Sequence, residues 1–256
     1  LIKYLLGHKN NFFVDNLEIN IFDKNKSIIS VKDIEFSNFG YNKNKVSGEI
    51  FEKKFIIIID NKFESINFRL LKTGINTDIN FKKKKKNFIS GVFKSKILKT
   101  NVKFDFDYDT KLLNVNNLFL RNKNLSLNSK SVIQLDPFFD ISSKIDVDDI
   151  NSKLFSNFNF YKLFNSKEIF KQINSKNEIN YNPKKFSKNY INDLNLKLDF
   201  GYGRINYLKK FSISKTFFQC KGNLNLLEEY PLIFFDCTII SANKKKFLKV
   251  FSIKTK

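Results

Sequence analysis

Apolar and polar residues alternate along most of this chain, and this period of two is the feature that most limits its fold. In "LEINI", Leu17, Ile19 and Ile21 fall on one side of an extended backbone, and the polar residues fall on the other. "NVKFDFDYD" repeats the pattern with Phe104 and Phe106 on one side. Successive side chains of a β-strand point to opposite faces, so the alternation predicts strands with one buried face and one solvated face.

Similar segments recur along the whole sequence, separated by short polar turns. The further predicted strands are 28–36, 45–51, 54–60, 65–71, 75–81, 87–93, 112–120, 124–135, 138–147, 191–200, 211–220, 231–241 and 246–253. Short connections join antiparallel strands, so neighbouring strands are expected to pair as antiparallel meanders. The sequence therefore predicts a mostly β protein.

One region departs from the period of two. Between 149 and 176 the apolar residues, such as Leu154 and Phe158, recur at spacings of three and four, which predicts one or two short amphipathic helices. Asp148 or Asp149 is the expected N-cap. The predicted division of one continuous domain is an antiparallel β region at 1–148, a helical insertion at 149–176 and a continuing antiparallel β region at 177–256.

A run of five lysines lies between two predicted strands. The run comprises Lys82, Lys83, Lys84, Lys85 and Lys86. Its place predicts a solvated turn, because lysine keeps a sheet soluble and discourages edge-to-edge pairing. Contact with anionic headgroups of a membrane surface is the alternative interpretation.

The net charge of +21 raises nucleic acid as a partner. A/T-rich codons are a second explanation, since Lys, Asn, Ile, Phe and Tyr are abundant while Pro and Gly are scarce. Nucleic-acid binding needs basic residues on one face together with exposed aromatic rings. Here the lysines are spread over turns and the 31 Phe residues favour inward positions, so no nucleic-acid partner is expected.

Nothing in the sequence predicts an enzyme, a metal site or a cofactor. His8 is the single histidine, which removes most nucleophile–base pairs and most zinc sites. Asp105, Asp107 and Asp109 could hold a hard cation, but the wet face of a strand explains them more simply. "GYGR", ending at Arg204, lacks the helix that a phosphate loop requires and predicts a turn.

Membrane anchoring and cysteine pairing stay open at this stage. No run reaches the roughly 18 apolar residues of a membrane-spanning helix. Because the chain contains no Met, we expect it to be a fragment whose anchor or export signal lies in a missing N-terminal segment. Cys220 and Cys237 fall in nearby strands, either paired in an oxidising compartment or as two buried thiols.

The order of segments resembles that of the AsmA-like family of bacterial envelope proteins, which is related to TamB. The resemblance covers most of the chain and rests on "LEINIFDKNKSIISVKDIEFSNFGYNKNKVSGEIF" and "LLNVNNLFLRNKNLSLNSKSVIQLDPFFDISSKIDVDDIN". It includes no catalytic motif, and the N-terminal membrane helix of the family is missing here. The resemblance implies a long, curved antiparallel sheet folded into a trough with an apolar concave side.

The resemblance also implies a function. Members are held in the inner membrane, reach into the periplasm, and are thought to support outer-membrane biogenesis by carrying phospholipid. The first hypothesis is therefore a non-enzymatic protein that binds or conducts lipid acyl chains along an apolar β-groove. The alternatives are a structural or partner-binding β-scaffold with a closed core, and a fragment of an outer-membrane β-barrel. The candidate groove residues are Ile66, Phe68, Phe104, Phe106, Phe139 and Ile141.

Overall fold

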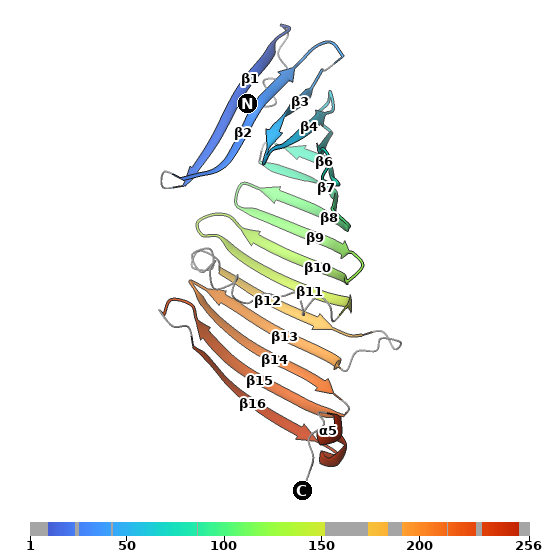
Figure 1. Ribbon diagram of the computed structural model, residues 1–256, viewed down its shortest axis with the longest axis vertical. Coiled ribbons are helices and arrows are strands. Elements are labelled where there is room, and N and C mark those ends of the chain that lie inside the picture. The colour runs from blue at the N-terminus through green and yellow to red at the C-terminus, as the bar shows by residue number, and fades with distance from the viewer. Residues whose placement is uncertain are drawn as a thin grey trace. The chain divides into compact units, whose positions relative to one another are not determined.

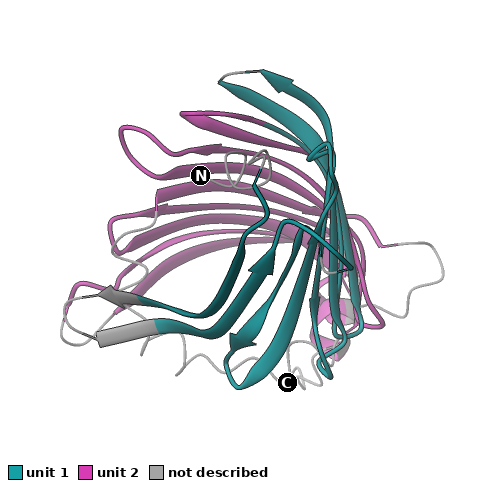
Figure 2. Cartoon of the chain, turned by 90° about the horizontal axis from the view of Figure 1, so that it is seen from above, with its two compact units in different colours: residues 1–107 teal, residues 108–256 magenta. Residues whose placement is uncertain are grey.

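The computed structural model describes residues 10–23, 26–41, 43–85, 87–151, 174–183, 191–213, 215–228 and 232–250. About 75% of them lie in strands, so the predicted mostly β fold is confirmed. The hydrogen-bonded order of the strands follows their order in the chain, from β1 to β16, in a sheet that is not closed (Figure 1). The chain divides into two compact units, residues 1–107 and 108–256 (Figure 2).

Unit 1 contains the first seven strands and most of the eighth. These strands are β1 (Phe13–Asp23), β2 (Lys26–Ser37), β3 (Lys45–Ile50), β4 (Lys53–Ile59), β5 (Ser65–Leu70), β6 (Ile75–Lys85), β7 (Phe88–Ile97) and β8 (Thr100–Asp109). From β1 to β7 each strand pairs antiparallel with the next, as the short turns predict.

Unit 2 contains the remaining strands and one described helix. They are β9 (Leu112–Arg121), β10 (Leu125–Gln134), β11 (Asp140–Ile150), β12 (Asn174–Tyr181), β13 (Ile191–Gly201), β14 (Arg204–Ile213), β15 (Thr216–Asn225), β16 (Ile233–Ser241) and α5 (Lys244–Val250). The sharp turn predicted at "GYGR" joins β13 to β14, with positive φ at Tyr202 and Gly203.

One strand pair differs from the predicted antiparallel meander. β11 and β12 are parallel, with Asp140 beside Asn174 and Val147 beside Tyr181. Parallel neighbours need a long connection that carries the chain back to the starting end of the first strand. The segment between Ile150 and Asn174 supplies that length, whereas the other connections are short.

The limits of the predicted helical insertion need correction. Residues 149–150 belong to β11 and residues 174–176 belong to β12, so both margins of the 149–176 insertion are strand. Its centre, residues 152–173, lies outside the described residues. The second β region therefore begins at Asn174 rather than at residue 177.

Three further predictions from the alternation are wrong in detail. The predicted strand 211–220 spans the turn between β14 and β15, because Phe211, Ile213 and Phe217 keep a period of two across it, although the apolar face passes from odd-numbered residues in β14 to even-numbered residues in β15. Residues 246–250 are helical in α5 rather than extended. Lys82 to Lys85 lie within β6 rather than in a turn, and the pairs Lys84–Ile89 and Lys85–Phe88 continue the ladder to its end.

Three glycines let aromatic rings lie flat against the sheet. A side chain at Gly48 would meet the ring of Phe55, and one at Gly91 would meet the ring of Phe106 at 2.8 Å. At Gly222 the ring of Tyr207 occupies the same place in unit 2. A glycine beside an aromatic ring on the next strand removes bulk where the ring needs space.

Substitution of Gly91 by alanine tests this packing. The added methyl group would collide with the Phe106 ring and with the backbone carbonyl of Asn80, so we expect a loss of about 1–3 kcal/mol in the free energy of unfolding. Gly201→Ala is the matched control, because no atom lies within 4 Å of its added Cβ. Urea denaturation measures both variants. Equal stability of the two variants would contradict the proposed role of Gly91.

The turn between β8 and β9 depends on a carboxylate. Asp109 accepts hydrogen bonds from the backbone N–H groups of Lys111 and Leu112, each at 2.7 Å. These bonds, that from Lys111 first, hold the pKa of the Asp109 carboxyl below its ordinary value. The ionised form is therefore the one that the folded turn favours.

The lowered pKa predicts an acid-dependent loss of stability. The contribution of Asp109 is present above its unfolded pKa and disappears as the pH falls through its lower folded pKa, below about 4. Asp109→Asn still accepts hydrogen bonds but does not titrate. We expect the unfolding midpoint of Asp109→Asn to fall less than that of the wild type between about pH 5 and pH 2.5. If the unfolding midpoints of the wild type and Asp109→Asn fell equally with pH, Asp109 would not be the source of the acid-dependent loss. NMR of the Asp109 carboxyl group measures its pKa directly.

Candidate functional site

One face of the unit 1 sheet collects the apolar side chains. Paired residues of neighbouring strands share a face, and the pairs Ile59–Ile66 and Ile66–Ile79 therefore align across β4, β5 and β6. Phe68 lies on this face between Ile57 and Thr77. We call this the apolar face of unit 1.

Phe104 and Phe106 join the same face from β8. The Phe104 ring stacks on Phe93 with ring centroids 4.5 Å apart, and the Phe106 ring meets Phe81 edge-on at 6.3 Å. Phe93 is opposite Ile79 in the ladder. The four candidate residues of unit 1, namely Ile66, Phe68, Phe104 and Phe106, are thus on one side of the sheet.

Unit 2 has an apolar face of its own. Ile141 of β11 is opposite Ile133 of β10 and beside Ser175 of β12. Phe139 lies just before β11 and is exposed, so it stands at the margin of this face. The other residues that the register places there include Ile145, Ile179, Leu194, Leu196, Leu198, Phe200, Ile205, Phe211, Phe218 and Leu224.

Burial follows this face strand by strand. In β15 the side chains of Thr216, Phe218 and Cys220 are buried, while Phe217 and Gln219 between them are exposed. Both faces of a flat, isolated sheet would be equally open to water. The strands of unit 2 bend (Figure 2), and a bent sheet brings the side chains of one face closer together than those of the other.

The apolar face of unit 2 is covered at both ends of β14 and β15. At one end Leu226 is fully buried against Ile205 and Leu224. At the other end Phe247 of α5 contacts the Phe218 ring, with centroids 5.7 Å apart. Lys209 lies between these ends, and its Nζ is 5.0 Å from the centroid of the Phe211 ring. The central part of the face therefore combines apolar side chains with one ammonium group.

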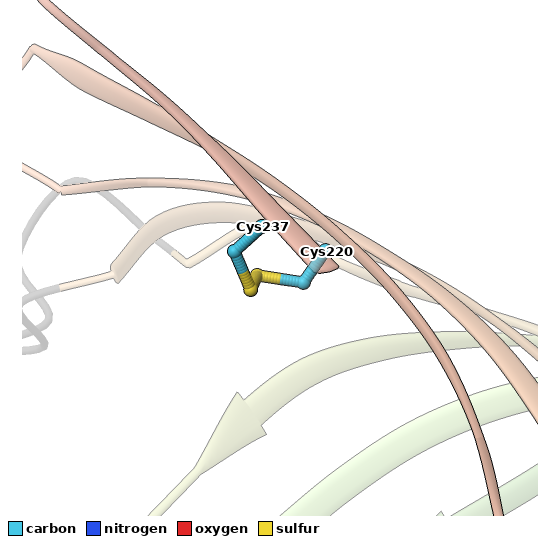
Figure 3. Close-up of a disulfide and its surroundings, with 2 residues drawn as sticks. All are labelled: Cys220 and Cys237. Atoms are coloured by element: carbon cyan, nitrogen blue, oxygen red, sulfur yellow. A yellow bond between two sulfur atoms is a disulfide. The ribbon is translucent and has the colours of Figure 1, made fainter. Parts of the chain in front are cut away.

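A disulfide joins the last two strands on this same face. Cys220 of β15 and Cys237 of β16 are directly opposite in the ladder and are bonded to each other. Of the two arrangements left open by the sequence, the structure has the disulfide. Figure 3 shows it on the concave side of the bent strands, which identifies the apolar face as the concave one at this point.

Loss of the disulfide is expected to weaken the folded state. The two cysteines are 17 residues apart, and closing a loop of that size contributes about 3 kcal/mol through the unfolded chain. Cys220→Ala/Cys237→Ala should therefore unfold at lower urea than the wild type. The wild type measured in a strong reductant serves as the control, and its urea midpoint should approach that of the double variant. An unchanged midpoint in both would contradict this expectation.

From β10 to β13 the opposite face of unit 2 is mostly polar. Lys130 and Lys144 are directly opposite each other, and Glu178 is opposite Lys197. These side chains line a hollow of about 520 Å³ together with Lys176 and Asp199. Like charges that face each other destabilise a strand pair, so this face depends on water to separate them. The two faces thus differ in chemistry across these four strands, whereas in β14 to β16 the second face also carries the apolar side chains of Leu208, Phe217, Phe234 and Ile240.

The lysine run is divided between the two faces of β6. The Lys82 ammonium lies 3.2 Å from the Asp105 carboxylate on the polar side. The Lys84 ammonium donates to the backbone carbonyls of Lys62 and Phe63 and lies 5.2 Å from the Phe63 ring centroid. Lys83 and Lys85 are exposed, and Lys86 lies outside the described residues.

The described residues do not form the metal site that the sequence analysis considered at Asp105, Asp107 and Asp109. Among them there is no group of three or more His, Cys, Asp or Glu side chains placed to hold a metal ion. Asp105 instead pairs with Lys82, and Asp109 holds a turn. Within the same part of the chain, no helix has the length and apolar character needed to cross a membrane.

The sequence analysis missed most of the apolar face of unit 2. Only Phe139 and Ile141 were named there, although 191–200 was identified as a strand with the same alternation. The signal was present in Leu194, Leu196 and Leu198. Lys209 was missed because no strand was predicted between 201 and 210, although the period of two places it on the same face as Tyr207 and Phe211.

Comparison with known proteins gives no further assignment. No family model matches the chain, and no curated protein matches it.

Proposed function

We propose that this chain is an AsmA-like protein of the bacterial envelope that binds or conducts phospholipid acyl chains without catalysing a reaction. It would act in the periplasm, anchored to the inner membrane by a segment outside this chain, and would support outer-membrane biogenesis. The observation that carries the proposal is the one-sided sheet. In each unit the strand register collects Phe, Ile and Leu on one face, and among the described residues no second layer of strands covers that face.

The energetics of lipid transfer favour such a surface. Moving an acyl chain into water costs about 0.8 kcal/mol per methylene, or roughly 13 kcal/mol for 16 carbons. A continuous apolar surface offsets most of that cost without any catalytic group. The stacked rings of Phe93 and Phe104 in unit 1 and of Phe211 and Phe218 in unit 2 are surfaces of this kind.

The disulfide supports the proposed periplasmic location, and two exposed lysines support the proposed contact with a membrane surface. A disulfide is typical of proteins in oxidising compartments such as the periplasm. Lys83 and Lys85 point their charge into solvent from the end of the β6–β7 hairpin and would attract anionic headgroups by about 1 kcal/mol each near a membrane surface. Lys82 and Lys84 contribute less, because protein groups already engage their ammonium groups.

The decisive experiment introduces a charge on the apolar face. Native mass spectrometry and lipid extraction of the chain purified from bacterial cells should detect bound phospholipid. Phe104→Asp places a carboxylate against the Phe93 ring, so we expect the variant to lose at least about nine-tenths of the bound lipid, because burying an unpaired charge costs several kcal/mol.

The control adds the same charge on the other face of the same strand. Asn101 is exposed and falls on the polar side of β8, so Asn101→Asp should retain wild-type lipid. Circular dichroism of both variants verifies folding, and Phe106→Asp provides a second test of the face. A folded Phe104→Asp variant with undiminished lipid, or a wild-type chain free of lipid, would overturn the proposal and favour a structural scaffold.

A further inference from the structure

Lys209 is a charged residue on the apolar face of unit 2, near the centre of β14. In the ladder it is opposite Leu196 of β13 and Cys220 of β15, and both of these residues belong to the apolar face. Its side chain is half-buried, whereas that of Lys210, which falls on the other face of the strand, is exposed. Because the disulfide of Cys220 lies on the concave side of the bent strands (Figure 3), Lys209 lies on the concave side as well.

The ammonium group of Lys209 contacts an aromatic ring rather than a hydrogen-bond acceptor. Its Nζ is 5.0 Å from the ring centroid of Phe211, and that ring stacks on the ring of Phe218 with centroids 4.5 Å apart. An ammonium group has three N–H donors, and its strongest hydrogen bonds are those to anionic oxygens. No hydrogen bond or ion pair among the described residues includes this ammonium group.

The described part of this face supplies no carboxylate for Lys209. From β12 to β16 the register places no Asp or Glu on the apolar face. The acidic residues of these strands fall on the other face; they are Glu178, Asp193, Asp199 and Asp236. α5, which packs on the apolar face through Phe247, contains lysines and no acidic residue. Lys209 is thus a cation in apolar surroundings with no counter-ion among the described residues.

Uncharged polar side chains on the same face bond to one another. The hydroxyl groups of Ser131 and Ser143 are 2.9 Å apart, and Asn177 donates to the hydroxyl oxygen of Ser175 at 2.9 Å. These groups have hydrogen-bond partners within the fold, whereas the ammonium group of Lys209 has none among the described residues.

We propose that Lys209 binds the phosphate of the phospholipid whose acyl chain occupies this face. The inference rests on the acyl-chain binding proposed above, and it adds a position for the headgroup and a preference between lipids. The phosphate oxygens would accept hydrogen bonds from the Lys209 ammonium group. The acyl chain would lie along the stacked rings of Phe211 and Phe218, next to that ammonium group.

Desolvation makes this contact selective for anionic amphiphiles. An acyl chain that lies beside Phe211 displaces water from the neighbouring ammonium group of Lys209. A buried charge without a partner is costly, so a neutral amphiphile with the same chain would leave an unpaired ammonium group in the complex. An amphiphile with a phosphate brings the counter-ion with it. The preference between the two amphiphiles arises from this difference.

Two probes that differ only in the phosphate test the proposal. They are lauroyl lysophosphatidic acid and monolauroylglycerol, each titrated below its micelle concentration into the full 256-residue chain and measured by calorimetry. The wild type should bind the lysophosphatidic acid at least about tenfold more tightly, because a hydrogen bond between charged groups contributes at least that factor. Physiological ionic strength is used, since salt screens a half-buried pair less than an exposed one.

Variants of two adjacent lysines locate the effect. Lys209→Gln removes the charge, so its preference for the phosphate probe should fall at least about fivefold, while its affinity for monolauroylglycerol is retained or increased. Lys209→Arg keeps the charge and should keep the preference. Lys210→Gln is the matched control, because it removes the same charge from the other face of the same strand and should bind both probes as the wild type does. Circular dichroism verifies the folding of all three variants.

Inorganic phosphate, titrated alone, separates a lipid headgroup from a free anion. It gains nothing from the apolar face, so it should bind the wild type at least about tenfold more weakly than lauroyl lysophosphatidic acid does. Binding of the two with equal affinity would overturn the assignment of Lys209 to a lipid headgroup.

The other outcomes separate this inference from the proposed function. If the wild type and Lys209→Gln have the same affinities for both probes, acyl-chain binding stands and the role of Lys209 is overturned. If the wild type binds neither probe, acyl-chain binding itself fails, and the role of Lys209 fails with it. Equal losses of affinity in Lys209→Gln and Lys210→Gln would show a general effect of charge and would also overturn the inference.

Discussion

The structure depends on the requirement that a sheet of one layer must bury apolar side chains using only its own strands. A sandwich buries its inner faces against a second sheet, but each unit described here has none. Burial comes instead from strand-to-strand registers that place Phe, Ile and Leu on one face, and from bending that brings those side chains together. From Thr216 to Lys221 in β15 this produces buried residues that alternate with exposed ones. A one-residue slip in any register would expose the buried set to water.

Aromatic rings and glycines make that arrangement possible. A ring that lies along the sheet needs a neighbour without a side chain, and Gly48, Gly91 and Gly222 supply it. The ring then shields the backbone of the glycine from water. Because these positions lie on the apolar face, the same pairs that allow close packing also provide the smooth aromatic surface on which the proposed acyl-chain binding depends.

Alternation predicted most of the strands and their faces, because which side of a strand is apolar indicates which side is buried. Ile66, Phe68, Phe104 and Phe106 share a face because their spacing is even within each strand and the turns set the register.

Features set by long-range geometry could not be predicted in this way. The parallel pairing of β11 with β12 depends on where a long connection returns, and Phe217, which continues the period of two from Phe211 and Ile213, concealed the turn between β14 and β15. The lysine run was misjudged because charge was taken to mark a turn, although β6 continues through Lys85 by means of a bulge near Phe81.

The disulfide is placed where the sheet has the least other support. An interior strand is held by ladders on two sides, but β16 is held only by β15 among the described strands, and its apolar side chains gain little from burial. Its separation from β15 would therefore cost less than the separation of any interior pair. A covalent bond in the centre of the pair, between Cys220 and Cys237, prevents that separation. The bond keeps an exposed, apolar strand in register with β15 where its side chains alone contribute little to holding it there.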